Sequence, residues 1–148
     1  MEILIIGILV VALMIYVSTR IKQSAREAYE QEVFENEQFI LVKPEGFIIP
    51  FNEKSPHLFE TYSKDFGDEE ARKLNQCWAT IDLKNGFKRN SSTKGKKTEN
   101  GVLIHTFTKT VGNKSANKTY ELEVSVLDKY KETFDDKITK ILNSFAIK

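Results

Sequence analysis

An uncharged apolar run near the N-terminus constrains this chain more than any other feature. Residues 3–17 read ILIIGILVVALMIYV, and the uncharged stretch continues through Ser18 and Thr19 until Arg20 ends it. A helix that spans a bilayer needs roughly 20 mainly apolar residues, with a lower limit near 17. We therefore predict a membrane anchor over residues 1–20. Its lipid-facing side chains are Ile3, Leu4, Ile5, Ile6, Ile8, Leu9, Val10, Val11, Leu13, Met14, Ile15, Tyr16 and Val17.

A cleaved signal peptide is the alternative interpretation of this segment. Such a peptide carries positive charge before its apolar run and small residues at the end of the run. Here Glu2 is the charged side chain before the run, and Tyr16 puts a bulky ring where a small residue is needed. A buried core helix is the third interpretation, but nothing polar interrupts either face of the run. The pattern favours a retained anchor.

The charges that flank the run predict its orientation. Arg20, Lys22 and Arg26 follow the apolar residues, whereas Glu2 precedes them. Positive charge accumulates on the cytoplasmic side of membrane helices. We therefore expect a single-pass protein of the cell membrane whose C-terminal part is cytoplasmic. In that orientation the matches to the acceptor pattern for N-glycosylation stay unmodified; they begin at Asn90, Asn113 and Asn117.

The helical pattern does not stop at the end of the apolar run. Ile21, Ala25, Ala28, Tyr29 and Val33 fall on one face of a helix. We predict that helix continues from the membrane to about residue 34, which gives a length of about 48 Å at 1.5 Å per residue. Residues 21–36 would then form an amphipathic stalk. Alternatively, this segment lies along the domain or along the membrane surface.

The remaining residues, 37–148, have the composition of one globular domain. Hydrophobic residues make up 41% of the chain, which excludes a disordered polymer. Alternating patterns and turn signals predict strands, and spacings of three and four predict helices. The predicted strands cover 38–43, 47–51, 58–64, 79–83, 102–111 and 119–127, and the predicted helices cover 69–78 and 130–145. The fold class is α+β, with a mainly antiparallel sheet packed by a long C-terminal helix.

Two short stretches resemble a known family. A strand that opens on Pro44-Glu45-Gly46-Phe47 and a final helix that ends Ile141-Leu142-Asn143-Ser144-Phe145 are similar to the PsbP/Mog1-type α/β/α sandwich. The resemblance covers about residues 38–147. It implies a non-catalytic role in binding or assembly, as in accessory subunits of membrane complexes. The chain departs from the photosynthetic members of this family because it has a retained anchor instead of an export peptide.

The side chains that usually carry catalysis or hold metals are few. The chain has one cysteine, Cys77, and two histidines, His57 and His105, without metal-ligand spacing. We predict that Cys77 is a buried apolar side chain and that His105 is a satisfied core or edge histidine. No serine lies in a Gly-x-Ser-x-Gly elbow. We therefore expect no enzyme activity, no cofactor and no metal site.

One basic segment stands out in a chain whose overall charge is balanced. Residues 84–101 carry six basic side chains against Glu99 alone: Lys84, Lys88, Arg89, Lys94, Lys96 and Lys97. One interpretation is a solvated, flexible hairpin loop. The other is a contact with anionic headgroups or with an acidic partner. Nucleic acid is not expected as a partner, because Phe87 is the segment's one aromatic residue and stacking platforms need several.

These observations lead to three competing functions. The favoured one is a membrane-anchored, non-catalytic interaction module, an accessory or scaffold subunit of a membrane-associated assembly with an unidentified protein partner. The alternative is a membrane-tethered small-ligand or lipid-binding domain, whose cavity would be lined by residues such as Phe107, Tyr120 and Phe134. An enzyme is the third, and it requires that the histidines, Cys77 and acidic residues meet in one cleft.

Overall fold

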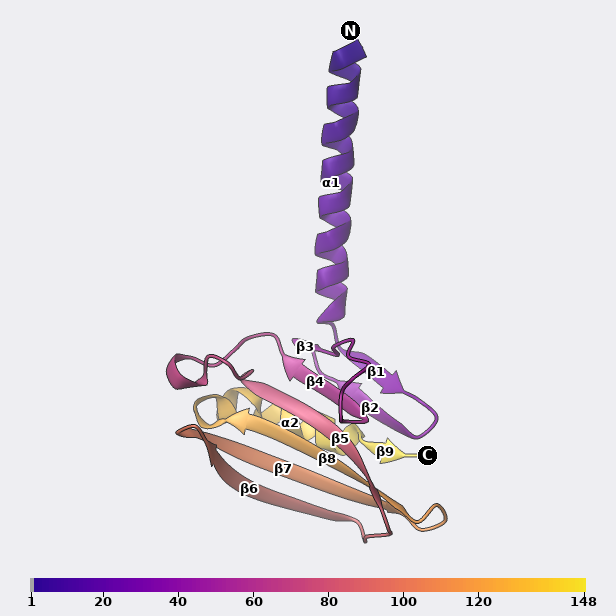
Figure 1. The fold of residues 1–148 in the computed structure, drawn as a ribbon, viewed down its shortest axis with the longest axis vertical. Coiled ribbons are helices and arrows are strands. Elements are labelled where there is room, and N and C mark those ends of the chain that lie inside the picture. The colour runs from indigo at the N-terminus through magenta and orange to yellow at the C-terminus, as the bar shows by residue number, and fades with distance from the viewer. Residues whose placement is uncertain (1) are drawn as a thin grey trace.

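The computed structural model describes residues 2–148, so Met1, the first residue of the predicted anchor, lies outside the described residues. A single long helix, α1 (Glu2–Ala28), projects from a domain that contains two antiparallel sheets and a second helix (Figure 1). The domain's elements are β1 (Glu32–Glu35), β2 (Phe39–Lys43), β3 (Phe47–Ile48), β4 (Phe59–Ser63), η1 (Glu69–Ala71), β5 (Cys77–Asn85), β6 (Ser91–Glu99), β7 (Val102–Asn113), β8 (Lys118–Leu127), η2 (Asp128–Tyr130), α2 (Lys131–Ser144) and β9 (Ala146–Ile147).

The larger sheet has six strands in the order β3-β4-β5-β8-β7-β6, and the smaller sheet has the order β1-β2-β9. Every pairing in both sheets is antiparallel. The α+β class and the mainly antiparallel sheet are therefore as the sequence predicted. The central strand β8 pairs with β5 through Val124 and Ala79, and with β7 through Val124 and Phe107. Because partners in register share a face, these side chains form one apolar layer.

This apolar layer is covered by α2 together with the small sheet. Phe134 of α2 packs edge-on against Phe47 with ring centroids 5.9 Å apart. At the other end of the helix Phe145 packs against Phe39 of β2, at 6.0 Å. The three described side chains that α2 buries, Phe134, Ile138 and Ile141, lie at the spacing that predicted the helix. The long C-terminal helix thus packs on the sheet, as expected.

The opposite face of the large sheet carries a smaller apolar cluster at one end. Ile104 and Leu127 are buried there against Ala71, with Leu74 and Trp78 packed beside them. The predicted helix over 69–78 is wrong, because only the single turn η1 forms and β5 begins at Cys77. The backbone bonds of this segment close a loop: Gly67 N donates to Leu74 O and Gln76 N donates to Asp65 O. The spacing of Ala71, Leu74 and Trp78 therefore indicated burial correctly and secondary structure incorrectly.

The predicted helical stalk to about residue 34 is also wrong. Helix α1 ends at Ala28, and Val33 and Phe34 lie in β1, paired with Val42 and Leu41 of β2. The ring of Phe34 lies 4.7 Å from that of Phe59, centroid to centroid. A half-buried aromatic that packs on the sheet outweighs the local helical pattern, so the segment from residue 32 onward belongs to the domain.

The remaining differences concern strand lengths and the basic segment. The strand expected over 47–51 shortens to β3, whereas the strand expected over 79–83 lengthens to β5. The basic segment is not a flexible loop: residues 91–99 form β6, which pairs with β7 along its whole length. The strands over 38–43, 58–64, 102–111 and 119–127 are confirmed within two residues as β2, β4, β7 and β8.

Candidate anchor and interaction surfaces

The apolar run of α1 is exposed along its length. The predicted anchor side chains from Ile3 to Val17 are all exposed. By its length and its apolar composition, α1 could cross a membrane. At the end of the apolar run Arg20 Nε donates to the Tyr16 hydroxyl (3.2 Å), and its guanidinium lies 5.6 Å from the centre of that ring. An aromatic and a cation side by side are typical of the headgroup level of a membrane helix.

A buried lysine joins α1 to the domain. The Lys43 side chain on β2 is 1% exposed, and its Nζ donates to three backbone oxygens: Ala28 O (2.8 Å), Glu30 O (2.6 Å) and Phe47 O (3.0 Å). An ammonium group has three N–H donors, so all of them are used. Ala28 is the last residue of α1, where carbonyls lack helical partners and carry partial negative charge. Lys43 therefore caps the helix from within the domain.

The electrostatics of Lys43 reflect this position. Burial lowers the pKa of its ammonium, and the nearby Glu32 and Glu30 carboxylates act in the opposite direction. The Glu32 carboxylate is largely exposed and lies 4.0 Å from Lys43 Nζ, so it is a weak partner. The three carbonyls are the partners that hold the charge in place.

Further contacts surround the same joint. Gly46 N donates to Tyr29 O at 2.7 Å, and the Lys64 ammonium lies 5.7 Å from the centre of the Tyr29 ring. A hollow of about 520 Å³ opens beside these groups and is also lined by Arg26 and Glu45. The end of α1 is thus attached to the domain through β2, the turn after it and Lys64, the residue that follows β4.

The six basic residues of the 84–101 segment do not form a single patch. Lys84 pairs with Glu121 at 2.7 Å and Lys97 pairs with Glu123 at 3.3 Å, both on the sheet face opposite α2. Lys88 and Arg89 lie in the exposed connection between β5 and β6. Lys94 and Lys96 oppose Phe107 and His105 in register, so they share the face that α2 covers.

The two lysines on the α2 side line a basic hollow. The hollow measures about 240 Å³ and lies between Lys94 and Lys96 of β6, His105 and Phe107 of β7, and Lys131, the first residue of α2. The Lys94 ammonium lies 5.7 Å from the centre of the Phe107 ring. Sequence reasoning identified Lys94 and Lys96, but it missed Lys131, which is 35 residues from Lys96 along the chain.

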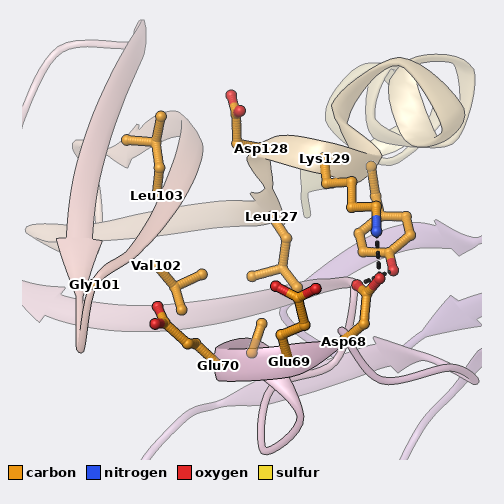
Figure 2. Close-up of a pocket in the computed structure, with 11 residues that line it drawn as sticks. Asp68, Glu69, Glu70, Gly101, Val102, Leu103, Leu127, Asp128 and Lys129 are labelled. Carbon is orange, nitrogen blue, oxygen red and sulfur yellow. Dashed lines mark hydrogen bonds and ion pairs between the residues drawn. The ribbon is translucent and has the colours of Figure 1, made fainter.

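A second hollow, of about 260 Å³, is acidic (Figure 2). Asp68, Glu69 and Glu70 border it from the η1 side, and Asp128 and Lys129 border it from η2. The tip of the β6–β7 hairpin closes the third side, where a Cβ on Gly101 would lie 3.2 Å from a Glu70 carboxylate oxygen. Gly101 has a φ of +80°, a left-handed conformation that glycine adopts without strain.

Two hydrogen bonds hold Asp68 in the acidic hollow. Its carboxylate accepts from Lys129 Nζ and, at 2.5 Å, from the Tyr130 hydroxyl (dashed in Figure 2). Both bonds lower the pKa of Asp68, and the bond from Lys129 has the larger effect. Asp68 thus fastens the η1 turn to η2.

The groups that an enzyme would use lie apart from one another. Cys77 is buried in the main core, as predicted, and burial raises the pKa of its thiol. His105 is also buried as predicted, with Nε2 2.5 Å from an Asp128 carboxylate oxygen. His57 Nδ1 lies 2.7 Å from Asp82, beside a different hollow. Within residues 2–148 no group of three or more metal-ligating side chains occurs.

The side chains expected to line a ligand cavity are core residues. Phe107, Tyr120 and Phe134 are each less than 10% exposed and belong to the main hydrophobic cluster. The rings of Phe134 and Phe47 pack together, with their centroids 5.9 Å apart. Of the three, Phe107 also lines the basic hollow of about 240 Å³.

Two lysines important for the structure were missed, although the sequence carried a signal for both. Lys43 follows Phe39 and Leu41 at alternate positions of one strand, and Lys109 follows His105 and Phe107 in the same way. Strand alternation places both on the inward face. Lys109 Nζ indeed donates to Leu142 O (2.7 Å) and Phe145 O (2.8 Å) at the C-terminal end of α2.

Among known proteins, the similarities lie in solved structures and are weak. No model of a protein family matches the chain, and no curated protein matches it in sequence. Among solved structures the chain is similar to the solution structure of cyanobacterial PsbP (CyanoP) from Synechocystis sp. PCC 6803, with a TM-score of 0.47 and 9% identity. The match covers 81% of this chain and 94% of the other. The α+β class is established by the element order and sheet topology described above.

Proposed function

We propose that the chain is a single-pass, membrane-anchored interaction module, an accessory or scaffold subunit of a membrane-associated assembly, with its domain on the cytoplasmic side. The observation that carries this proposal is the joint between α1 and the domain. An apolar helix with no packing partner in residues 2–148 is capped by Lys43, a buried lysine of the domain. A buried charge that caps α1 supports a function in which the helix holds the domain at a defined position.

The length of α1 beyond the apolar run supports the same proposal. Eight residues, from Ile21 to Ala28, continue the helix after Arg20, which adds about 12 Å at 1.5 Å per residue. The interfacial layer of a bilayer is roughly 5 to 7 Å thick on each side. The domain would then stand just clear of the headgroups, at a set distance, with its far surfaces free for a protein partner.

A non-catalytic role is part of the proposal. Cys77 is buried, and the His57 and His105 pairs lie beside separate hollows. Nucleophilic catalysis needs a nucleophile within hydrogen-bonding reach of its base. Among the described residues neither histidine ring is hydrogen-bonded to a serine hydroxyl or to the Cys77 thiol; the rings pair with Asp82 and Asp128 instead. This supports binding or positioning over chemistry.

The anchor is tested by fractionation of cell membranes that contain the full chain. We expect the protein to resist extraction with alkaline carbonate and to retain residues 2–17 when its intact mass is measured. A matched variant, Val10→Arg, places a charge at the middle of the span and should reduce the membrane-bound fraction. A mass that lacks the apolar run would identify a cleaved signal peptide and would overturn the anchor.

The interaction role is tested separately, by native purification from membranes in mild detergent. We expect the chain to migrate in a complex larger than the monomer, with stoichiometric partners identified by mass spectrometry. Recovery of the chain only as a free monomer, under conditions in which other membrane complexes remain intact, would contradict an accessory or scaffold role.

A further inference from the structure

Strand β6 leaves one edge of the large sheet open. It is the last strand in the order β3-β4-β5-β8-β7-β6, and within residues 2–148 its one strand partner is β7. All nine of its residues are exposed. An edge strand presents a row of unpaired N–H and C=O groups along its outer side, which another extended chain can complete. At about 3.4 Å per residue, this edge is about 30 Å long.

The charges of β6 are sorted between the two faces of the sheet. Lys97 is already paired with Glu123 on the open face. Lys94 and Lys96 point to the α2 side, where they meet Lys131 around the basic hollow of about 240 Å³. Among the described residues no carboxylate lies within 4.0 Å of these three ammonium groups. The uncompensated positive charge therefore lies at the open edge, on its α2 side.

These two features together select the chemistry of a partner. We propose that β6 is the docking edge for an extended, acidic segment of a partner protein, which adds a strand beside β6 and places alternate carboxylates next to Lys94, Lys96 and Lys131. Directly opposite side chains on neighbouring strands have Cβ atoms about 4.5 to 5.5 Å apart, within reach of an ion pair. The inference rests on the proposed function, because it names the partner class of that interaction module.

The same lysines disfavour the obvious competitor, a second copy of this chain. Two β6 strands paired edge to edge would bring lysines of like charge together, and lysines on an edge are a common protection against self-association. An acidic segment removes this repulsion and replaces it with attraction. Charge thus distinguishes a specific partner from self-pairing.

The position of β6 in the molecule leaves it accessible while α1 is in a membrane. Figure 1 shows β6 on the side of the domain away from α1, with β7 and β8 between it and the joint. Anionic headgroups are therefore not within reach of Lys94 and Lys96 in an upright domain. A protein that approaches from the aqueous side meets this edge first.

The proposal is tested with the full chain in detergent micelles and a fluorescent peptide of about ten residues in which glutamate and threonine alternate. A control peptide alternates glutamate and proline, so it has the same charge but cannot form the strand hydrogen bonds. We expect the first peptide to bind at least about tenfold more tightly than the second, by fluorescence anisotropy. We also expect it to slow hydrogen exchange of β6 amides.

Two double variants separate the site from general charge. Lys94→Glu with Lys96→Glu should weaken binding of the glutamate–threonine peptide by about tenfold or more. Lys54→Glu with Lys114→Glu makes the same change of charge at exposed positions away from β6 and should leave binding within about twofold. Circular dichroism checks that both variants are folded.

Three results would overturn the docking edge: equal binding of the two peptides, equal losses in the two double variants, or no binding of either peptide. Equal binding would mean that only charge attracts the peptide. If peptide binding is absent but the chain still purifies in a complex, the proposed function stands and only the β6 site is wrong. If the peptide binds but the chain is monomeric in membranes, the β6 site stands and the proposed function is wrong.

Discussion

Lys43 is the residue on which the attachment of α1 depends most directly. Its ammonium is buried with three carbonyl partners, whereas the Glu32 carboxylate is largely exposed and 4.0 Å away, so the hydrogen bonds, not an ion pair, hold the charge. Hydrogen bonds that involve a charged group contribute about 1.5 to 3 kcal/mol each, but desolvation of the ammonium offsets much of this. The net value of the residue lies in donating to all three of these carbonyls.

We expect Lys43→Met to lower the free energy of unfolding by about 2 to 4 kcal/mol, because Ala28, Glu30 and Phe47 lose the donor to their carbonyls. The measurement is urea unfolding of the full chain in mild detergent, followed by fluorescence of Trp78, the single tryptophan. Lys54→Met is the control, since an exposed lysine should change stability by less than about 0.5 kcal/mol. Equal stability of the two variants would show that the joint is not fixed by Lys43.

Asp68 gives a pH-dependent prediction at the same scale. Its pKa is lowered below 3.8 by hydrogen bonds from Lys129 and Tyr130. A carboxyl whose pKa is lowered in the fold binds its proton more readily when unfolded, so its stabilising effect is present above pH 3.8 and is lost as pH falls through the folded pKa.

We therefore expect Asp68→Asn to melt at a lower temperature than the parent at neutral pH. The difference should shrink below about pH 4 and vanish in stronger acid, where Asp68 of the parent is protonated. Thermal unfolding followed by circular dichroism across this range tests it. A gap between parent and variant that does not change with pH would mean that the loss comes from packing and not from the carboxylate charge.

At the scale of whole elements, the sequence predicts the helices and strands that have apolar residues on one buried face. Strand β8 alternates Tyr120, Leu122, Val124 and Val126 inward, and α2 repeats apolar residues every three or four positions. These patterns arise from a single buried face, and their periods of about 2 and 3.6 distinguish strand from helix. Such elements can be recognised before the fold is known.

Strand β6 could not be predicted in that way. Its sequence, SSTKGKKTE, contains no apolar residue to mark a buried face. The strand forms because it pairs with β7 along its whole length. This pairing depends on the fold of the hairpin and leaves no apolar pattern in the sequence of β6. The basic hollow was hidden for the same reason, since Lys131 reaches Lys94 and Lys96 only through the packing of α2 on the sheet.

The connection that leads into β6 makes an element-scale prediction. A Cβ on Gly112 of β7 would lie 1.9 Å from the Lys88 carbonyl oxygen and 2.7 Å from the Phe87 ring, so the β5–β6 connection crosses directly over this glycine. Gly112→Ala should lower the free energy of unfolding by about 1 to 3 kcal/mol, because the backbone must move.

Gly95→Ala is the matched control for Gly112→Ala. A Cβ there meets the Thr106 hydroxyl at 3.0 Å, and that hydroxyl belongs to a side chain that can rotate. We expect the control to lose less than half as much stability in the same urea titration. The reverse order of the two variants would contradict the crossing of the connection over Gly112.

At the scale of the whole molecule, α1 and β6 lie at opposite ends of the long axis (Figure 1). The attached end is fixed by Lys43 and Tyr29, and the far end offers the open sheet edge. With the anchor in a bilayer, this arrangement presents the edge to the aqueous phase. Under the proposed function, the side of the membrane on which the domain lies would decide which partners it can meet.

The predicted side follows from the charges around the apolar run, and the chain carries its own reporters for it. The acceptor patterns that begin at Asn90, Asn113 and Asn117 lie in the domain. In a cell-free translation with microsomes they are modified only if the domain enters the lumen. Because Arg20 and Lys22 follow the run and Glu2 precedes it, we expect the parent chain to remain unmodified.

A charge-altered variant, Glu2→Lys with Arg20→Gln and Lys22→Gln, adds a positive charge before the run and removes two of the three after it, Arg26 being kept. We expect a glycosylated fraction to appear on gels and to disappear after treatment with endoglycosidase, since orientation follows the excess of lysine and arginine. Asn90→Gln, Asn113→Gln and Asn117→Gln in the same background should abolish the shift. Glycosylation of the parent chain itself would place the domain outside the cytoplasm, and the acidic partner of β6 would then have to be sought there.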